Sequence, residues 1–431
     1  MTHSRTLNLI TMGCSKNLVD SEHLAAYARE AGYKIVFDSN RLFNEVVIIN
    51  TCGFIGDAKK ESIDMILRAA SAKHRGKIEK LYVIGCLSER YREELRTEIP
   101  EVDEYFGAKT LREIISVLGQ KAENENHIRR VQSTPKHYAF LKISEGCDWM
   151  CGYCAIPLIR GRHRSVPMEI LVEEARNLAQ NGVRELIVVA QDTTYYGMDL
   201  YGKRMLAELL ERLCKIEKIR WIRLHYAYPT DFPEEVIEVM ARQKKICNYI
   251  DIPLQHISDH MLQAMKRRHT KRDALLLVEK LRKRIPDIAI RTTLMVGYPS
   301  ETEKDFNELC EFVQKTKFER LGVFSYSEEE GTYSATRLSD DVSEEEKQKR
   351  RDAIMDLQRS ISTRRNDALI GRVTEVMVDY REGPYYIGRT YADSPEVDGE
   401  VLISTTHRLT RGCIYQATIT AADEYDIYAT I

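Results

Sequence analysis

The chain has 431 residues, and its 64 lysines and arginines nearly balance 66 aspartates and glutamates, giving a formal charge of −2. At about 100–200 residues per domain, this length predicts two to four domains. Because the charges nearly balance, the net charge gives no indication of nucleic-acid binding. No apolar run approaches the ~18–20 residues of a membrane span, and the N-terminus lacks a signal-peptide pattern, so we expect a soluble cytoplasmic protein.

Near the N-terminus, three short apolar runs each end in a cysteine: LNLITMGC at Cys14, EVVIINTC at Cys52 and KLYVIGC at Cys86. Helical patterns over 18–31, 58–72 and 89–96 follow these runs. This alternation predicts a parallel α/β domain over 1–120. The polar residues 121–136 are typical of a linker.

From residue 137 the alternation resumes with longer helices. Apolar runs predict strands at 138–143, 185–190, 219–225, 249–253, 289–296 and 320–325. The segments between them carry apolar residues at helical spacing. Six repeats are fewer than the eight of a closed barrel, so they predict a partial (β/α)6 barrel over 137–366. Short β-rich segments over 367–431, separated by glycine and proline, indicate a small all-β barrel.

The segment SEGCDWMCGYCAIP follows the first strand of this expected barrel and carries Cys147, Cys151 and Cys154. Three thiolates at this spacing on one loop can bind one iron–sulfur cube and leave one iron open to a small molecule. The alternatives are a zinc knuckle and ordinary loop cysteines. Structural zinc sites use four closed ligands, which this loop does not supply, so the spacing favours a cluster.

Cys14, Cys52 and Cys86 occupy equivalent positions, each at the end of an expected strand. Because ligands gather at the carboxyl ends of parallel strands, these three residues are expected to be neighbours that bind a metal group. One such cysteine would suit simple packing, but three are harder to explain that way. We interpret the remaining cysteines as structural: Cys214, Cys247, Cys310 and Cys413.

With these cysteines, the sequence resembles the radical S-adenosylmethionine (SAM) superfamily and, over nearly its whole length, the methylthiotransferase family. Supporting segments are GCSKNLVDSE, NTCGF, DIPLQHIS and VGYPSETEKDF. The resemblance implies two 4Fe-4S clusters, one on each cysteine trio, with SAM bound at the cluster of the barrel loop. It also implies a C-terminal TRAM domain.

The implied chemistry has two SAM-dependent half-reactions. One SAM methylates a sulfur carried by the N-terminal cluster, and a second yields a radical that removes hydrogen from an unactivated carbon, which then receives the methylthio group. The resemblance further implies a flavodoxin or ferredoxin as reductant and a separate sulfur donor.

Two branches of the family differ in substrate. One modifies an adenosine of transfer RNA (the MiaB type), and the other modifies the β-carbon of an aspartate in ribosomal protein S-twelve (the RimO type). The segments GCSKNLVDSE and GRTYADSPEVDG look like the second branch. A non-catalytic scaffold that binds zinc or RNA is the third alternative.

The charge of residues 368–431 bears on this choice. Five arginines face ten carboxylates there, a net charge of −5. An RNA-binding module is normally basic, so we expect the TRAM domain to dock a basic protein, and direct RNA binding is disfavoured. A solvated acidic surface is the alternative.

By resemblance, five further residues are candidate SAM contacts: Tyr153 matches the family's aromatic position near the adenine, and each of the other four could equally be a satisfied polar residue at a strand end. Tyr153 precedes the last cysteine of the loop, and the others follow or lie on expected strands: Gln191, Asp192, Gln255 and Arg291. The basic stretch KRRHTKR at 266–272 is either a solvated helix end or part of the mouth of the site.

Overall fold

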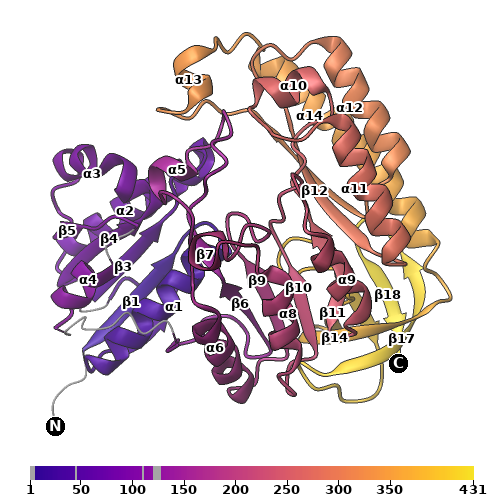
Figure 1. Cartoon of the computed structure of the whole chain (residues 1–431). Coiled ribbons are helices and arrows are strands. Elements are labelled where there is room, and N and C mark those ends of the chain that lie inside the picture. Colours follow the sequence, from indigo (N-terminus) through magenta and orange to yellow (C-terminus); the bar gives the residue numbers. More distant parts are fainter. Residues whose placement is uncertain (1–4, 44–45, 109–110, 120–127) are drawn as a thin grey trace.

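The computed structural model describes residues 5–43, 46–108, 111–119 and 128–431. Figure 1 shows two α/β units side by side and a small β-barrel packed under the larger of them. Among the described residues, no helix is long and apolar enough to cross a membrane.

The N-terminal unit is a five-stranded parallel sheet in the order β2-β1-β3-β4-β5. Helices cover both faces, with α2 and α3 packed on one side and α1 and α4 on the other. β1 and β3 are neighbours although their helices lie on opposite faces, so a crevice opens at their carboxyl ends. The elements are β1 (Thr6–Thr11), α1 (Ser15–Glu30), β2 (Lys34–Phe37), β3 (Val46–Thr51), α2 (Gly56–His74), β4 (Lys80–Gly85), α3 (Cys86–Glu98), β5 (Glu104–Tyr105) and α4 (Leu111–Val117).

The second unit is an open sheet of six parallel strands in the order β13-β12-β11-β10-β9-β6. This confirms the expected partial barrel. Its strands are β6 (Tyr138–Lys142), β9 (Glu185–Val189), β10 (Trp221–Leu224), β11 (Ile246–Asp251), β12 (Ala289–Val296) and β13 (Arg320–Ser325). Its main helices are α6 (Met168–Gln180), α8 (Leu206–Cys214), α9 (Glu234–Arg242), α11 (Lys271–Arg284), α12 (Glu303–Thr316) and α14 (Glu344–Asp367).

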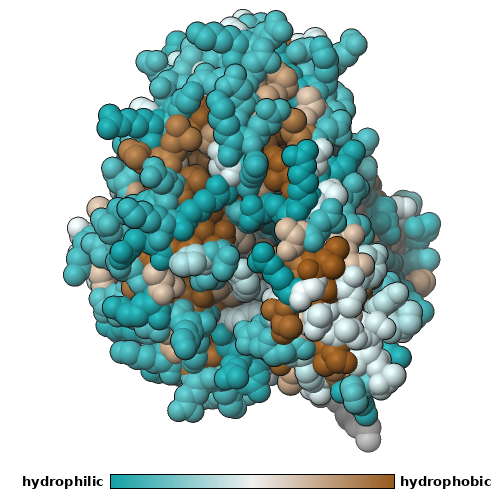
Figure 2. Space-filling model, turned by 90° about the vertical axis from the view of Figure 1, so that its right-hand side faces the viewer, coloured by the Kyte–Doolittle hydropathy of each residue, from teal (hydrophilic) through white to brown (hydrophobic). Residues whose placement is uncertain are grey.

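These helices bury one apolar face against the strands in a single large core. The opposite, outward face is mostly hydrophilic, and only separated hydrophobic areas interrupt it (Figure 2). Short elements decorate the loops: β7 (Ser144–Glu145), α5 (Ile156–Ile159), β8 (Arg164–Ser165), α7 (Met198–Tyr201), α10 (Asp259–Ala264) and α13 (Tyr333–Arg337).

The C-terminal unit is a closed barrel in the order β14-β15-β16-β18-β17. This confirms the small all-β barrel expected from the short β-rich segments, and β18, a four-residue strand next to the chain end, completes it. It closes the barrel by pairing with β16 in parallel and with β17 in antiparallel fashion. The strands are β14 (Val373–Glu382), β15 (Tyr385–Arg389), β16 (Val401–Ser404), β17 (Ile414–Ala422) and β18 (Ile427–Thr430).

The end of β15 and the segment that follows it dock this barrel on the six-stranded sheet. Arg389 is buried and pairs with both Glu185 at the start of β9 and Asp379 on β14. Arg223 of β10 binds the other oxygen of Glu185 at 2.8 Å. Buried charges of this kind are tolerated only when they are paired, so these ion pairs fix how the barrel docks.

This docking corrects our interpretation of the acidic C-terminal charge. Asp393 pairs with Arg320, Asp398 accepts a hydrogen bond from Tyr249, and Glu396 accepts one from Tyr138. The side chains of Asp379, Asp393 and Asp398 are largely buried, so three of the ten carboxylates serve contacts inside the molecule, whereas Glu396 stays exposed. Seven carboxylates and four arginines remain on the outer surface of the module, so a partner meets less negative charge there than the composition gives.

The linker expected at 121–136 lies partly outside the described residues, which resume at 128. In its described part, the side chain of Arg130 is buried and pairs with Glu22 of α1 and Glu174 of α6. This stretch thus ties the two α/β units together.

Candidate active site

The three N-terminal cysteines follow three adjacent strands of the first sheet. Cys14 comes after β1, Cys52 directly follows β3, and Cys86 follows β4 and opens α3. A Cβ atom at Gly13 would lie 2.8 Å from the sulfur of Cys52, so the chain beside Cys14 touches the next cysteine. The sheet order therefore brings these cysteines together at one edge, as the sequence predicts.

Burial favours the protonated form of two of these thiols, Cys52 and Cys86. Burial raises the pKa of Cys52 to about 11 and also raises that of Cys86, while the nearby Arg160 guanidinium acts in the opposite direction. Both thiols also interact electrostatically with Cys14. Neutral thiols are therefore favoured until a metal group takes the place of their protons.

The second trio lies on the loop between β7 and α5. The amide of Cys147 donates to the carbonyl of Gly161 at 3.1 Å, and that of Cys154 donates to the carbonyl of Cys151 at 3.1 Å. Burial raises the pKa of Cys147 to about 12 and that of Cys154 further, and the three thiols interact electrostatically. The loop is thus folded with its sulfurs grouped.

No three His, Cys, Asp or Glu side chains within the described ranges approach closely enough to hold a single metal ion. A structural zinc ion draws four ligands onto one point. An iron–sulfur cube instead takes each thiolate on a different iron, so its protein sulfurs stay apart. Each trio offers three thiols, the donor type that iron–sulfur clusters take, and binding of a cluster by either trio stays a prediction.

An arginine and a tyrosine from distant loops cover Cys151. The Tyr228 hydroxyl lies 3.6 Å from its sulfur, and Nη1 of Arg267 lies 3.8 Å from it. Arg267 also stacks 4.2 Å over the Tyr228 ring and donates to the carbonyl of Pro253. No motif in the sequence marks Tyr228, and Arg267 belongs to the basic stretch 266–272, whose pattern fits a solvated helix end as well as the mouth of the site.

Trp149, inside the cysteine loop, connects two of these groups. Its ring stacks on Tyr228 with centroids 4.3 Å apart, and its Nε1 donates to Asp192 at 2.6 Å. Asp192 also accepts from the amide and hydroxyl of Thr194. Asp192, a candidate SAM contact, therefore already supports the cysteine loop.

Two other candidates also reach this loop. The Tyr153 hydroxyl lies 3.5 Å from Nη1 of Arg267, and Gln191 donates to Glu145, two residues before Cys147, at 2.7 Å. These contacts put both side chains beside the cysteines, and their roles in SAM binding stay predictions.

The last two candidates have other surroundings. Gln255 adopts a left-handed backbone with φ of 70° and bridges to Leu294 of β12. Arg291 pairs with Asp251 at 3.2 Å and with Asp398 of the docking segment at 3.4 Å. The contacts of Arg291 thus point toward the C-terminal barrel, and SAM binding by either residue stays a prediction.

Several buried polar atoms of Gln191 and of the stretch 266–272 lack a hydrogen-bond partner in the described structure. They are Oε1 of Gln191, Nε of Arg267 and both ring nitrogens of His269. Burial, together with the Arg267 charge, lowers the pKa of His269 to about 3, so its ring is neutral. Buried polar atoms normally have partners, and these suit a small polar ligand such as SAM.

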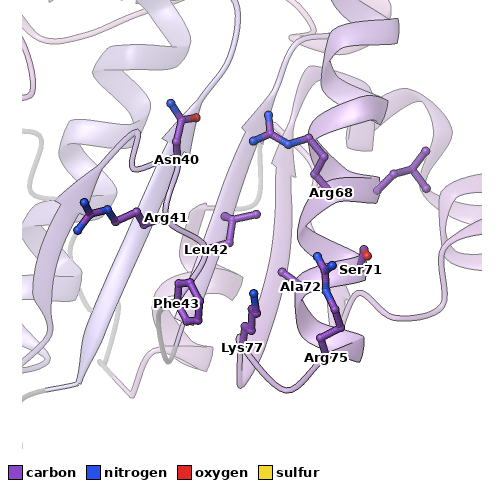
Figure 3. Close-up of a pocket in the computed structure, with 10 residues that line it drawn as sticks. Asn40, Arg41, Leu42, Phe43, Arg68, Ser71, Ala72, Arg75 and Lys77 are labelled. Atoms are coloured by element: carbon purple, nitrogen blue, oxygen red, sulfur yellow. The ribbon is translucent and has the colours of Figure 1, made fainter.

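A separate groove of about 580 Å³ lies on the N-terminal unit, away from these residues. Figure 3 shows it between the segment 40–43 and the α2 helix. Its lining has four basic residues, and the Lys77 ammonium lies 4.5 Å over the Phe43 ring. None of the six cluster cysteines lines it, so we do not assign it to the active site.

Three family models match successive parts of the chain. Uncharacterized protein family UPF0004 matches residues 6–107, the radical SAM superfamily matches 141–313, and the TRAM domain matches 370–431. The second and third matches coincide with the open sheet and with the closed barrel. The class is therefore that of a radical SAM enzyme with a C-terminal TRAM domain.

Curated relatives are similar over the full length. The ribosomal protein uS12 methylthiotransferase RimO of Bacteroides fragilis is 53% identical over 428 residues, which cover 99% of each chain. Its namesake from Flavobacterium johnsoniae is 51% identical over 424 residues, covering 98% of this chain and 97% of the relative. The chain belongs to the RimO family of radical SAM methylthiotransferases.

Solved structures share the fold at low identity. The radical SAM methyltransferase TsrM of Kitasatospora setae, solved with cobalamin and a 4Fe-4S cluster, gives a TM-score of 0.56 at 14% identity and covers 75% of this chain and 72% of its own. The cobalamin-dependent radical SAM enzyme OxsB gives 0.52 at 14% identity, covering 83% and 56%.

Proposed function

We propose that the chain adds a methylthio group to the β-carbon of an aspartate of ribosomal protein S-twelve (uS12). The observation that carries the proposal is the 53% identity, over 99% of both chains, to a uS12 methylthiotransferase. The two cysteine groups support it, because the reaction requires one group for radical formation and one for sulfur delivery.

Under this proposal, each cysteine group holds a 4Fe-4S cluster: Cys147, Cys151 and Cys154 at one site, and Cys14, Cys52 and Cys86 at the other. When bound, the clusters and SAM supply the electron, the radical, the sulfur and the methyl group. Arg267 and Tyr228 shield Cys151 from water, and Trp149 holds the loop against Asp192. No general acid–base pair is needed for hydrogen removal by a radical.

The side chains with partner-free polar atoms are the expected contacts of SAM. His269, neutral and buried, offers one donor and one acceptor, which would suit the carboxylate and amino groups of SAM. Nε of Arg267 would add a charged donor and Oε1 of Gln191 an acceptor.

The alternative substrate, transfer RNA, has less support. The outward charge of the TRAM domain is seven carboxylates against four arginines, which is less acidic than its composition but still unlike an RNA-binding surface. We therefore retain docking of a basic ribosomal protein by this domain.

The substrate is tested by an anaerobic assay of the protein reconstituted with iron and sulfide. SAM and a reduced flavodoxin or ferredoxin are added, and uS12 and unmodified transfer RNA are offered side by side, each followed by mass spectrometry. We expect a methylthio mass gain on one aspartate of uS12. A gain on transfer RNA alone would overturn the proposed substrate.

The same assay tests the division of labour between the trios. Cys151→Ala should abolish formation of 5′-deoxyadenosine, whereas Cys52→Ala should retain it and lose methylthio transfer. The exposed Cys413 provides the control, since Cys413→Ala should change neither product. Transfer by Cys52→Ala would contradict the role of the N-terminal trio.

A further inference from the structure

Arg160 belongs to the second α/β unit but lies in the N-terminal cysteine site. It caps α5, six residues after Cys154, and is only 2% exposed. In Figure 1, α5 lies beside α3 of the N-terminal unit. Arg160 is the first basic residue after Cys154, and its side chain therefore extends from the radical SAM loop into the N-terminal unit.

The guanidinium of Arg160 touches both units. Nη2 lies 3.4 Å from the sulfur of Cys86 and also donates to Oδ1 of Asn17. Nη1 donates to Asp20 of α1 at 2.8 Å and to Glu145 at 3.1 Å. Because Glu145 is two residues before Cys147, this single side chain connects the surroundings of both trios.

Cys86 also packs against the loop that carries Arg160. Its side chain forms a buried cluster with Ala155 and Ile159. A sulfur enclosed in this way by the other unit has little access to water, so a nearby cation acts on it with little screening.

We propose that Arg160 is a positioning residue that completes the N-terminal cluster site from the neighbouring unit and sets the reduction potential of that cluster. The inference rests on the proposed second cluster at Cys14, Cys52 and Cys86. Reduction adds a negative charge to a cluster, and a cation hydrogen-bonded to one of its thiolates stabilises the reduced form. Arg160 therefore raises the potential of this cluster.

The test uses the full chain with Cys147, Cys151 and Cys154 replaced by alanine, so that only the N-terminal cluster is measured. The midpoint potential is followed by electron paramagnetic resonance, and iron loss to a chelator is timed. We expect Arg160→Gln to shift the potential to more negative values and to speed iron loss ~10-fold or more.

Two variants separate this role from simple packing. Arg160→Lys keeps the positive charge and should bring the potential back toward that of the parent. Lys142→Gln removes a cation from the same network, where Lys142 binds Asp20 and Glu145, but not from the sulfur, and should shift the potential much less.

An unchanged potential in Arg160→Gln, or an equal shift in Lys142→Gln, would overturn the role of Arg160 while leaving the second cluster in place. A parent variant that binds no iron and sulfide would instead overturn the second cluster and, with it, this inference.

Discussion

Gly146 precedes the first cysteine of the radical SAM loop in a backbone conformation that other residues rarely adopt. Its φ is +77°, and a Cβ atom there would lie 2.1 Å from the carbonyl oxygen of Arg162. Left-handed strain alone costs about 1–3 kcal/mol, and the collision must also displace the segment 161–162, whose Gly161 carbonyl receives the Cys147 amide. We expect Gly146→Ala to lower the melting temperature and to lose most iron from this site.

Gly202 provides the matched control for this change. It has a φ of +67°, but a Cβ atom there would meet nothing within 4 Å. Gly202→Ala should therefore lower the melting temperature only by the effect of backbone strain, and the protein should keep its iron. Equal iron content in Gly146→Ala and Gly202→Ala would show that the collision is relieved without moving the cysteine.

Among the elements, β15 carries the strongest contact between the TRAM domain and the open sheet. Arg389→Ala would leave Glu185 and Asp379 short of a buried partner, and removing one partner from a buried ion pair costs about 3–5 kcal/mol. Urea unfolding should show this loss, whereas Arg372→Ala, at an exposed position, should change stability by less than ~0.5 kcal/mol. A comparably small change in Arg389→Ala would mean that the ion pairs do not hold the barrel.

The elements also mark the limit of prediction from sequence. The strand ends were predictable because each apolar run in the sequence stops at a cysteine. Since the carboxyl ends of parallel strands share one edge of a sheet, this pattern placed Cys14, Cys52 and Cys86 together at that edge. The contacts of Arg160, Tyr228 and Arg267 were not predictable from the sequence. Each contact joins loops that are far apart in the chain, so the sequence contains no spacing pattern that would indicate it. The closing strand β18 and the internal use of the TRAM carboxylates likewise depend on tertiary pairing.

At the scale of the whole molecule, the two cysteine trios belong to different units, so transfer between them depends on how these units are held together. Glu329, in the segment before α13, accepts from Lys59 at 2.9 Å and from Arg90 at 2.7 Å, and its side chain is 4% exposed. Both cations belong to the N-terminal unit. Glu329 is therefore a clamp between the units, and Arg90 extends its contacts to the N-terminal trio by donating to the carbonyl of Gly53, next to Cys52, at 3.0 Å.

Replacing this clamp should uncouple the two halves of the reaction. Glu329→Gln leaves two cations facing each other without a counter-charge, and a displacement of about 1 Å can cost ~100-fold in rate. We expect 5′-deoxyadenosine formation to persist while the methylthio product falls ~10-fold or more, with faster hydrogen exchange in α3 and α13. Glu328→Gln, the same change at an exposed neighbour, should leave both products unchanged. If Glu329→Gln lowers both products equally, the clamp acts on the radical site itself and not on the alignment of the two units.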